Sequence, residues 1–276
     1  MSTTRTYLDH AATTPVRPEV LEAMLPYLGG SFGNPSSGHW HGRAASAGLE
    51  QARREVAQAL GVRSHEVFFT SGGTEADNLA IMGRAEAVRA TGRAPVVAVA
   101  ATEHKAVLAA AHAVTARGGT ERLLPVDSIG QLRPDAFREA LSADPAVVSA
   151  MWVNNETGVI LPVAELAAEC AERGITFHSD LVQGFGKLPF DLSGTAIGLA
   201  TISGHKIGAP KGVGALIVRG GASIAPLVVG GSQQRGLRPG TENIAGAVGL
   251  GRAATLAVAE QAAELTRLAG LRATLV

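Results

Sequence analysis

The sequence predicts an α/β protein whose core is a mostly parallel sheet covered by helices on both faces. Short apolar runs recur along the chain, helical stretches lie between them, and small polar residues follow several of the runs directly. Strands of a parallel sheet are buried on both faces, so they appear as continuous apolar runs. A chain of 276 residues with 46% hydrophobic content is long enough to bury such a core.

The elements follow one another in the alternating order of strand and helix. The expected strands occupy, in chain order, 67–70, 95–101, 146–153, 175–180, 198–203 and 212–219. The expected helices occupy 74–90, 104–119, 162–174 and 241–276. The last of these is rich in alanine and is the longest. This alternation is typical of strand–helix–strand units.

Composition narrows the class of protein. Acidic and basic residues balance at 24 each, and there is no basic stripe of the kind that binds nucleic acid or a membrane surface. The N-terminus lacks the apolar core of a signal peptide, and no apolar run approaches the ~20 residues of a membrane span. We therefore expect a soluble, cytoplasmic protein.

Cysteine and histidine give no sign of a metal site or a disulfide. Cys170 is the single cysteine, and it lies on the apolar side of the expected helix 162–174, so we interpret it as a core residue. His39 and His41 flank Trp40, but acidic or cysteine partners at metal-ligand spacing are missing. The sequence predicts no metal.

Polar clusters follow five of the expected strands. SGGTEADN comes after 67–70, ATEHK after the second strand, NNETG after the third, SDLVQ after the fourth and SGHK after the fifth. Ligands bind at the carboxyl ends of the strands in an open parallel sheet. Each cluster alone fits an ordinary turn, but their coincidence at one edge predicts a pocket.

The residue types in this pocket suggest a particular cofactor chemistry. The chain has only four lysines, Lys105, Lys187, Lys206 and Lys211, and Lys206 lies in TISGHKIGAPKGVG (201–214). A lysine amine can attack a carbonyl, which an arginine cannot do. SGGT at a strand-to-helix junction suits a phosphate, although neither GxxxxGK[ST] nor GxGxxG occurs. Asp180 could keep a heterocyclic nitrogen protonated. Together these are the requirements of pyridoxal phosphate.

Eight motifs in register resemble the cysteine desulfurases of the class V aminotransferase superfamily. They are YLDHAATTPVRPEV, GNPSSGHWHGR, FTSGGTEADNLAI, ATEHKAV, VNNETGVI, DLVQGFGKLPFDL, SGHKIGAPKGVGAL and RGLRPGTENIAGAVGLGRA, which cover the chain from Tyr7 to about Ala253. The resemblance implies the large domain of a fold type I pyridoxal 5′-phosphate enzyme, usually a homodimer. Such an enzyme takes sulfur from L-cysteine, leaves L-alanine, and passes the sulfur to an acceptor or scaffold protein for iron–sulfur cluster assembly or tRNA thiolation.

The resemblance also assigns roles to residues of this chain. Lys206 and His104 would be catalytic, Lys206 by binding the cofactor's aldehyde and His104 by stacking on the ring and moving protons. Asp180 would pair with the ring nitrogen, Gln183 would hydrogen-bond the phenolic oxygen, and Asn155 would lie near the ring. The phosphate would be held by Gly73, Thr74, Ser203, Gly204 and His205, with Thr241 reaching the phosphate of the neighbouring subunit. Thr241 would also suit the N-cap of the last helix, and Asn34 could approach the substrate.

One part of the family pattern has no match in these 276 residues. The family's sulfur-accepting cysteine and its substrate-binding arginine lie well downstream of the lysine, and Cys170 does not match that cysteine. We therefore expect an N-terminal segment (1–15), a cofactor-binding large domain (16–255) and the start of an interdomain helix (256–276), with the small C-terminal domain largely absent. We expect the chain as given to lack desulfurase turnover. A selenocysteine lyase, an aminotransferase and a non-catalytic paralogue remain alternatives.

Overall fold

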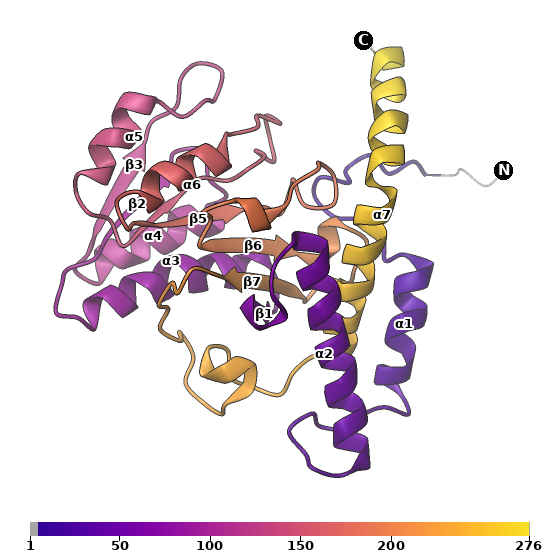
Figure 1. Cartoon of the computed structure of the whole chain (residues 1–276). Coiled ribbons are helices and arrows are strands. Elements are labelled where there is room, and N and C mark those ends of the chain that lie inside the picture. Colours follow the sequence, from indigo (N-terminus) through magenta and orange to yellow (C-terminus); the bar gives the residue numbers. More distant parts are fainter. Residues whose placement is uncertain (1–4, 276) are drawn as a thin grey trace.

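The computed structural model describes residues 5–275, and its centre is a seven-stranded sheet with the order β1-β7-β6-β5-β4-β2-β3 (Figure 1). The strands are β1 (Val67–Thr70), β2 (Val96–Ala100), β3 (Thr120–Leu124), β4 (Val147–Ser149), β5 (Thr176–Asp180), β6 (Leu199–Ser203) and β7 (Gly214–Val218). The helices are α1 (Pro18–Leu28), α2 (Trp40–Leu60), α3 (Gly73–Arg89), α4 (Lys105–Ala116), α5 (Pro134–Leu141), α6 (Val163–Ala171) and α7 (Ile244–Leu275).

The sheet is mostly parallel, as the sequence predicts, with β7 as its antiparallel member. β7 pairs antiparallel with β1 on one side and with β6 on the other. Because β1 and β6 are both antiparallel to β7, they run in the same direction as each other, and β5, β4 and β2 follow β6 in parallel. The ends of β1, β2, β4, β5 and β6 therefore meet at one edge, which is the arrangement expected from the five polar clusters.

Helices cover both faces of the sheet, as expected. Along β2, Val97 and Val99 pack with α3 and α4 on one face, whereas Ala98 and Ala100 pack on the other face with α2, α5, α6 and α7. All four residues are fully buried. This explains why the strands show continuous apolar runs: neither face is open to water.

Three details differ from the sequence prediction. The expected strand 146–153 pairs only as Val147–Ser149, because the chain then turns and Val153 forms an isolated bridge with Ile160. The sequence analysis did not predict the short strand β3 or the helices α1, α2 and α5. The last helix begins at Ile244 and not at Thr241. The Asn243 side-chain oxygen accepts a hydrogen bond from the Gly246 backbone N–H at 2.9 Å, so Asn243, and not Thr241, caps α7.

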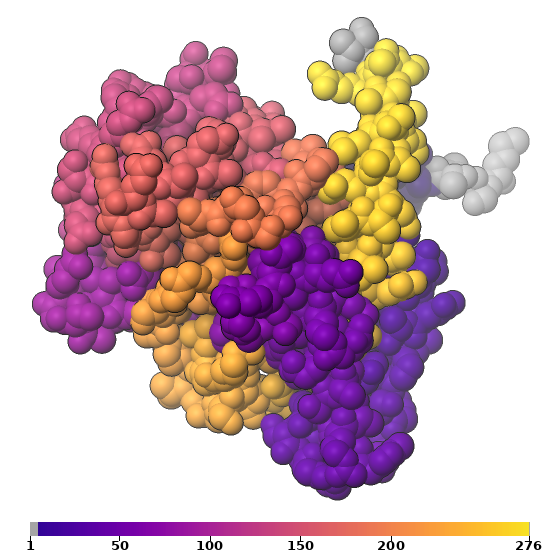
Figure 2. All heavy atoms as spheres, in the orientation of Figure 1, coloured from indigo at the N-terminus to yellow at the C-terminus, as the bar shows by residue number. Residues whose placement is uncertain are grey.

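The first part of α7 packs against α1 and α2, and its burial ends at Ala254. The remaining turns project from the body of the molecule (Figure 2). The expected domain boundary after 255 coincides with this change in burial but stays a prediction. Val276, the end of the expected helix, and the first four residues of the expected N-terminal segment lie outside the described residues. Within 5–275, no helix is both long and apolar enough to cross a membrane.

Candidate active site

A cavity of about 370 Å³ opens at the sheet edge where the five strands end. Its lining includes nine of the predicted site residues: Gly73, Thr74, His104, Asn155, Asp180, Gln183, Ser203, His205 and Lys206. The N-terminal segment adds Asp9, Ala11 and Ala12 to the wall. The structure thus brings together residues that lie far apart in the sequence, from Asp9 to Lys206.

The N-terminus of α3 forms one end of this cavity. Gly73 and Thr74 are its first residues, so their backbone N–H groups precede the first hydrogen-bonded turn and are available to an anion. A Cβ atom added to Gly73 would lie 3.3 Å from Cγ2 of Val182 and 3.5 Å from Cβ of Ser203, so glycine keeps this space open. An adjoining cavity shares Gly73, Thr74, Ser203 and His205 and adds the cation of Lys211. The geometry suits a phosphate.

Asp180 lies at the end of β5, with only 4% of its surface exposed. One carboxylate oxygen accepts a hydrogen bond from the Val182 backbone N–H at 2.8 Å. Burial raises the pKa of Asp180 to about 6, while the Val182 N–H and the nearby charge of Lys206 partly oppose that rise. A cationic group that binds next to Asp180 in the cavity would therefore stabilise its ionised form.

Lys206 follows β6 in a short turn, and its ammonium group donates hydrogen bonds to two backbone carbonyls of the N-terminal segment. The distances from Nζ are 2.6 Å to Ala11 O and 2.8 Å to Ala12 O. Burial lowers the pKa of Lys206, and the charges of Asp180 and Asp9 work against that shift. A lowered pKa raises the fraction of neutral amine, which is the nucleophilic form.

His104 caps the N-terminus of α4. Its Nδ1 accepts a hydrogen bond from the Ala106 backbone N–H at 3.1 Å. Burial lowers the pKa of His104, and the charges of Lys206 and Lys105 lower it further. The ring is therefore neutral near pH 7, and its remaining nitrogen, Nε2, carries the proton.

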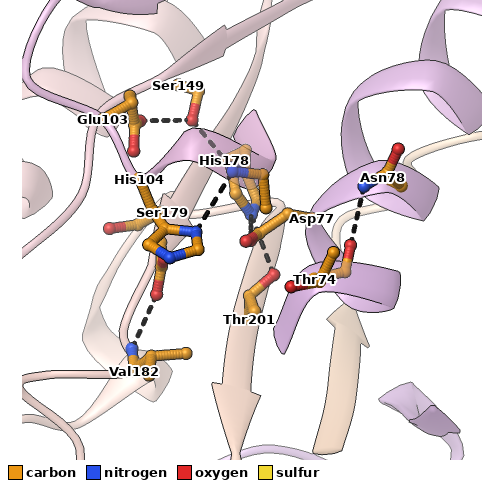
Figure 3. Close-up of polar contacts among 12 residues, drawn as sticks. Thr74, Asp77, Asn78, Glu103, His104, Ser149, His178, Ser179, Val182 and Thr201 are labelled. Carbon is orange, nitrogen blue, oxygen red and sulfur yellow. Dashed lines mark hydrogen bonds and ion pairs between the residues drawn. The ribbon is translucent and has the colours of Figure 1, made fainter. Parts of the chain in front are cut away.

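A buried polar network that the sequence analysis missed adjoins the cavity through Asp77, and Figure 3 shows its contacts. The Ser149 hydroxyl donates to Glu103 at 2.6 Å and contacts Nδ1 of His178 at 2.8 Å, and Nε2 of His178 lies 3.0 Å from the Thr201 hydroxyl. Asp77 lines the cavity, and its Oδ1 lies 3.7 Å from Nε2 of His178. The sequence offered one signal, which is that His178 and Thr201 are polar residues at the middle of the short strands β5 and β6.

The ionisation of this network follows from its burial. Burial raises the pKa of Glu103 to about 8 and raises the pKa of Asp77 well above its usual value, and the charge of Asp180 contributes to both shifts. Burial lowers the pKa of His178 to about 3. His178 is therefore neutral, and its contact with Asp77 is not an ion pair. Asp180, with a pKa of about 6, therefore ionises more readily than Glu103, with a pKa of about 8.

Four residues that the sequence analysis discussed do not line the cavity. Gly204 is buried in the turn before Lys206, where a Cβ atom would lie 3.0 Å from Cβ of Ala209, so it serves the close packing of that turn. Thr241 and Asn34 are exposed and lie outside the cavity. Cys170 is fully buried in α6, and burial raises the pKa of its thiol to about 12. Among residues 5–275 there is no group of three His, Cys, Asp or Glu side chains that could hold a metal ion.

The donor set of the cavity fits pyridoxal phosphate. It offers a lysine amine with a lowered pKa, a buried carboxylate that needs a cationic partner, and an open helix N-terminus for an anion. These match the cofactor's aldehyde, ring nitrogen and phosphate in turn.

Comparisons with known proteins agree with this geometry. The model of the "Aminotransferase class-V" family matches residues 6–270. A protein of Dictyoglomus turgidum named cysteine desulfurase IscS is 46% identical over 96% of this chain and 67% of its own length. The chain thus spans about two thirds of that relative.

Two solved structures extend the agreement. One, named NifS-like protein, has a TM-score of 0.94 and 38% identity, over 99% of this chain and 74% of its own. Another, described as SspA in complex with cysteine, has a TM-score of 0.85 and 36% identity, over 91% of this chain and 72% of its own. Relatives of this kind depend on pyridoxal phosphate. The chain belongs to the class-V aminotransferase family of pyridoxal-phosphate enzymes.

Proposed function

We propose that the chain carries pyridoxal phosphate on Lys206 and forms the cofactor-binding domain of a cysteine desulfurase, whose substrate is L-cysteine. The observation that carries the proposal is that the Lys206 amine, the Asp180 carboxylate and the N-terminus of α3 line one cavity. The names of the relatives, and the structural neighbour SspA that was solved in complex with cysteine, support the choice of substrate.

In this proposal, each residue of the cavity has a separate role in binding the cofactor or moving protons. When bound, the cofactor supplies an electron sink for charge that develops at the substrate's α-carbon. Asp180 holds the ring nitrogen protonated, the N-terminus of α3 binds the phosphate, and Gln183 donates to the phenolic oxygen. His104, with its proton on Nε2, lies where it can stack on the ring and exchange a proton with the substrate. Asn155 orients the ring and the substrate.

The sulfur must leave the β-carbon of L-cysteine for a thiolate nucleophile. Cys170 cannot supply that thiolate, because its thiol is fully buried and its pKa is raised to about 12. We therefore expect the 276-residue chain, in which Cys170 is the single cysteine, to release sulfide no faster than free pyridoxal phosphate does.

The Cys170→Ser variant should behave as the wild type does in that assay. The measurement is sulfide release from L-cysteine in excess dithiothreitol, with wild type, Cys170→Ser and cofactor alone side by side. Robust turnover that disappears in Cys170→Ser would overturn this assignment. Robust turnover that survives the substitution would point to direct elimination, as in a lyase.

Thr241 leads to a proposal about assembly. It is exposed and outside the cavity of its own chain, so a contact with a cofactor phosphate would have to be made in a second copy. We propose a homodimer in which each Thr241 hydroxyl donates to the phosphate bound by the partner.

Thr241→Ala should then weaken cofactor retention roughly tenfold, the effect of one hydrogen bond to a charged group. Dilution of the wild type should also release cofactor, because binding and association are linked. Equilibrium dialysis and sedimentation measure these effects. Thr266→Ala, an exposed threonine on α7, is the matched control. A monomer that keeps full cofactor affinity would contradict the proposal.

A further inference from the structure

A second lysine lies beside the cofactor cavity, and the proposed function gives it no role. Lys187 is half-buried, and its Nζ donates a hydrogen bond of 2.7 Å to Oε1 of Gln183. Lys187, Gln183 and Lys206 all line a second cavity of about 790 Å³. Two of the four lysines of the chain therefore line the same cavity as this glutamine.

The chemistry of the two side chains fixes which end of the Gln183 amide faces which way. An ammonium group has three donors and no acceptor, so the atom that faces Lys187 must be the amide oxygen. The amide nitrogen then lies on the opposite side, where Nε2 donates to the backbone oxygen of Ala11 at 2.9 Å. A primary amide carries two hydrogens on its nitrogen, so one N–H of Gln183 remains available to the cofactor cavity, which Gln183 also lines.

The backbone between these two residues is held tightly. The Lys187 and Leu188 backbone N–H groups both donate to Gly184 O, at 3.0 Å and 2.9 Å. Gly184 leaves no space for a Cβ atom against the ring of Trp152. Gly186 has a φ of 74°, and a Cβ atom there would lie 2.8 Å from Cβ of Ala257 on α7. The turn is thus packed between Trp152 and α7, which keeps Lys187 opposite Gln183.

Two partners favour the present orientation of the Gln183 amide: the Lys187 ammonium at its oxygen and the Ala11 carbonyl at its nitrogen. Without Lys187, only the contact with Ala11 would oppose a rotation of the amide by half a turn, which would place its oxygen toward the cavity. That oxygen would face the phenolic oxygen of the cofactor, and two acceptors would meet where a donor and an acceptor had met. Burial and the charge of Lys206 lower the pKa of Lys187 to about 8. The charged form of Lys187 is therefore less favourable at this position than it would be on a lysine exposed to water.

We propose that Lys187 is a positioning residue that orients the Gln183 amide so that its N–H donates to the phenolic oxygen of the bound cofactor. The proposal rests on the cofactor site proposed above. Lys187 acts through Gln183 and does not touch the reacting atoms.

The test is a pH titration of the visible absorption band of the bound cofactor, together with the cofactor dissociation constant. In Lys187→Met the titration midpoint should rise by about one pH unit, since an oxygen that has lost a donor holds the neighbouring proton more tightly. Cofactor affinity should fall roughly tenfold. Lys187→Arg keeps a cationic donor and should restore most of both values. Lys105→Met removes the charge of an exposed lysine near His104 and controls for charge alone.

The Gln183→Ala background separates orientation from direct charge effects. In that background, Lys187→Met should shift the midpoint no more than Lys105→Met does in the wild type. A shift that persists at full size in the Gln183→Ala background would overturn the proposal, as would an unchanged titration in Lys187→Met alone. If the wild type itself shows no visible band, the cofactor site proposal fails, which is a different outcome from either of these.

Discussion

The Lys206→Ala variant should lose the covalently held cofactor and with it the visible absorption band near ~400 nm that a lysine-bound pyridoxal phosphate shows. Lys206 is the lysine that lines the cavity at the carboxyl ends of the strands, and the charge of Asp180 acts on it there. The neighbouring lysine Lys187 is held by Gln183 through its own hydrogen bond. Alanine leaves no amine in that position, so the cofactor would be bound only through its phosphate and ring. The measurement is an absorption spectrum after reconstitution and gel filtration.

Borohydride and peptide mapping give the decisive control. Reduction should fix the cofactor on the peptide that carries Lys206 in the wild type and on no peptide in Lys206→Ala. Lys105→Ala removes an exposed lysine outside the cavity, and it should keep the full band. If Lys206→Ala retains an equal band that borohydride fixes to the protein, another lysine carries the cofactor and the site assignment is wrong.

A second effect of Lys206→Ala should appear at the N-terminal segment. The Lys206 ammonium donates to Ala11 O and Ala12 O, and His205 contacts the Thr13 hydroxyl at 3.1 Å. Removal of the two Lys206 hydrogen bonds should loosen this segment while the sheet stays intact. Amide exchange would show the change as faster exchange around Ala12.

The pocket could be predicted from the sequence because its residues follow parallel strands. Asp180 is the last residue of β5 and Lys206 lies in the turn that follows β6, and the topology of a parallel sheet places such positions at one edge. That argument needs no knowledge of side-chain contacts. The antiparallel strand β7 does not change this conclusion. It lies between β6 and β1 and is antiparallel to both, so β6 and β1 run in the same direction.

The contacts that complete the site could not be predicted in this way. The hydrogen bonds from Lys206 to Ala11 and Ala12 join residues almost two hundred positions apart, and no local pattern encodes them. The same is true of Glu103, Ser149 and His178, which lie on three different segments. Each looked like an ordinary loop or strand residue until the fold brought them together. The hydrogen bond from Lys187 to Gln183 joins residues that are close in the sequence. Whether it can orient the amide toward the cofactor depends on which side of the amide faces the cavity, and the sequence does not show this.

The Asp180→Asn variant should make the protein without cofactor more stable while it weakens cofactor binding. Asp180 is buried, and its pKa is raised to about 6 from the usual 3.8. A raised carboxyl pKa means that the folded state disfavours the ionised form. The cost is therefore absent below about pH 4 and fully present above about pH 6, where it reaches roughly 3 kcal/mol. Asparagine keeps the shape and can still accept the hydrogen bond from Val182, but it carries no charge.

Urea denaturation at several pH values measures the free energy of unfolding. Asp180→Asn should raise it relative to the wild type above about pH 6 and should leave it unchanged below about pH 4. Asp77 and Glu103 remain in both variants, and their pKa values should fall when the charge of Asp180 is removed. Asp191→Asn is the matched control. Asp191 is exposed, and the Ser193 N–H holds the pKa of that carboxyl below its usual value, so the same exchange there should give no gain. A gain for Asp180→Asn that is equal at all pH values would mean that charge is not its cause.

Cofactor binding should change in the opposite direction. In the wild type, a protonated ring nitrogen would give the buried Asp180 carboxylate a cationic partner. Asparagine carries no negative charge that would keep the ring nitrogen protonated. Removing one partner of a buried pair costs on the order of 3 kcal/mol, so we expect the dissociation constant for the cofactor to rise by about 100-fold. Equilibrium dialysis of both variants at one pH measures the difference. Equal affinities would show that Asp180 does not face the ring nitrogen. A more stable apoprotein that binds the cofactor more weakly would show that the Asp180 carboxylate destabilises the fold and stabilises the bound cofactor.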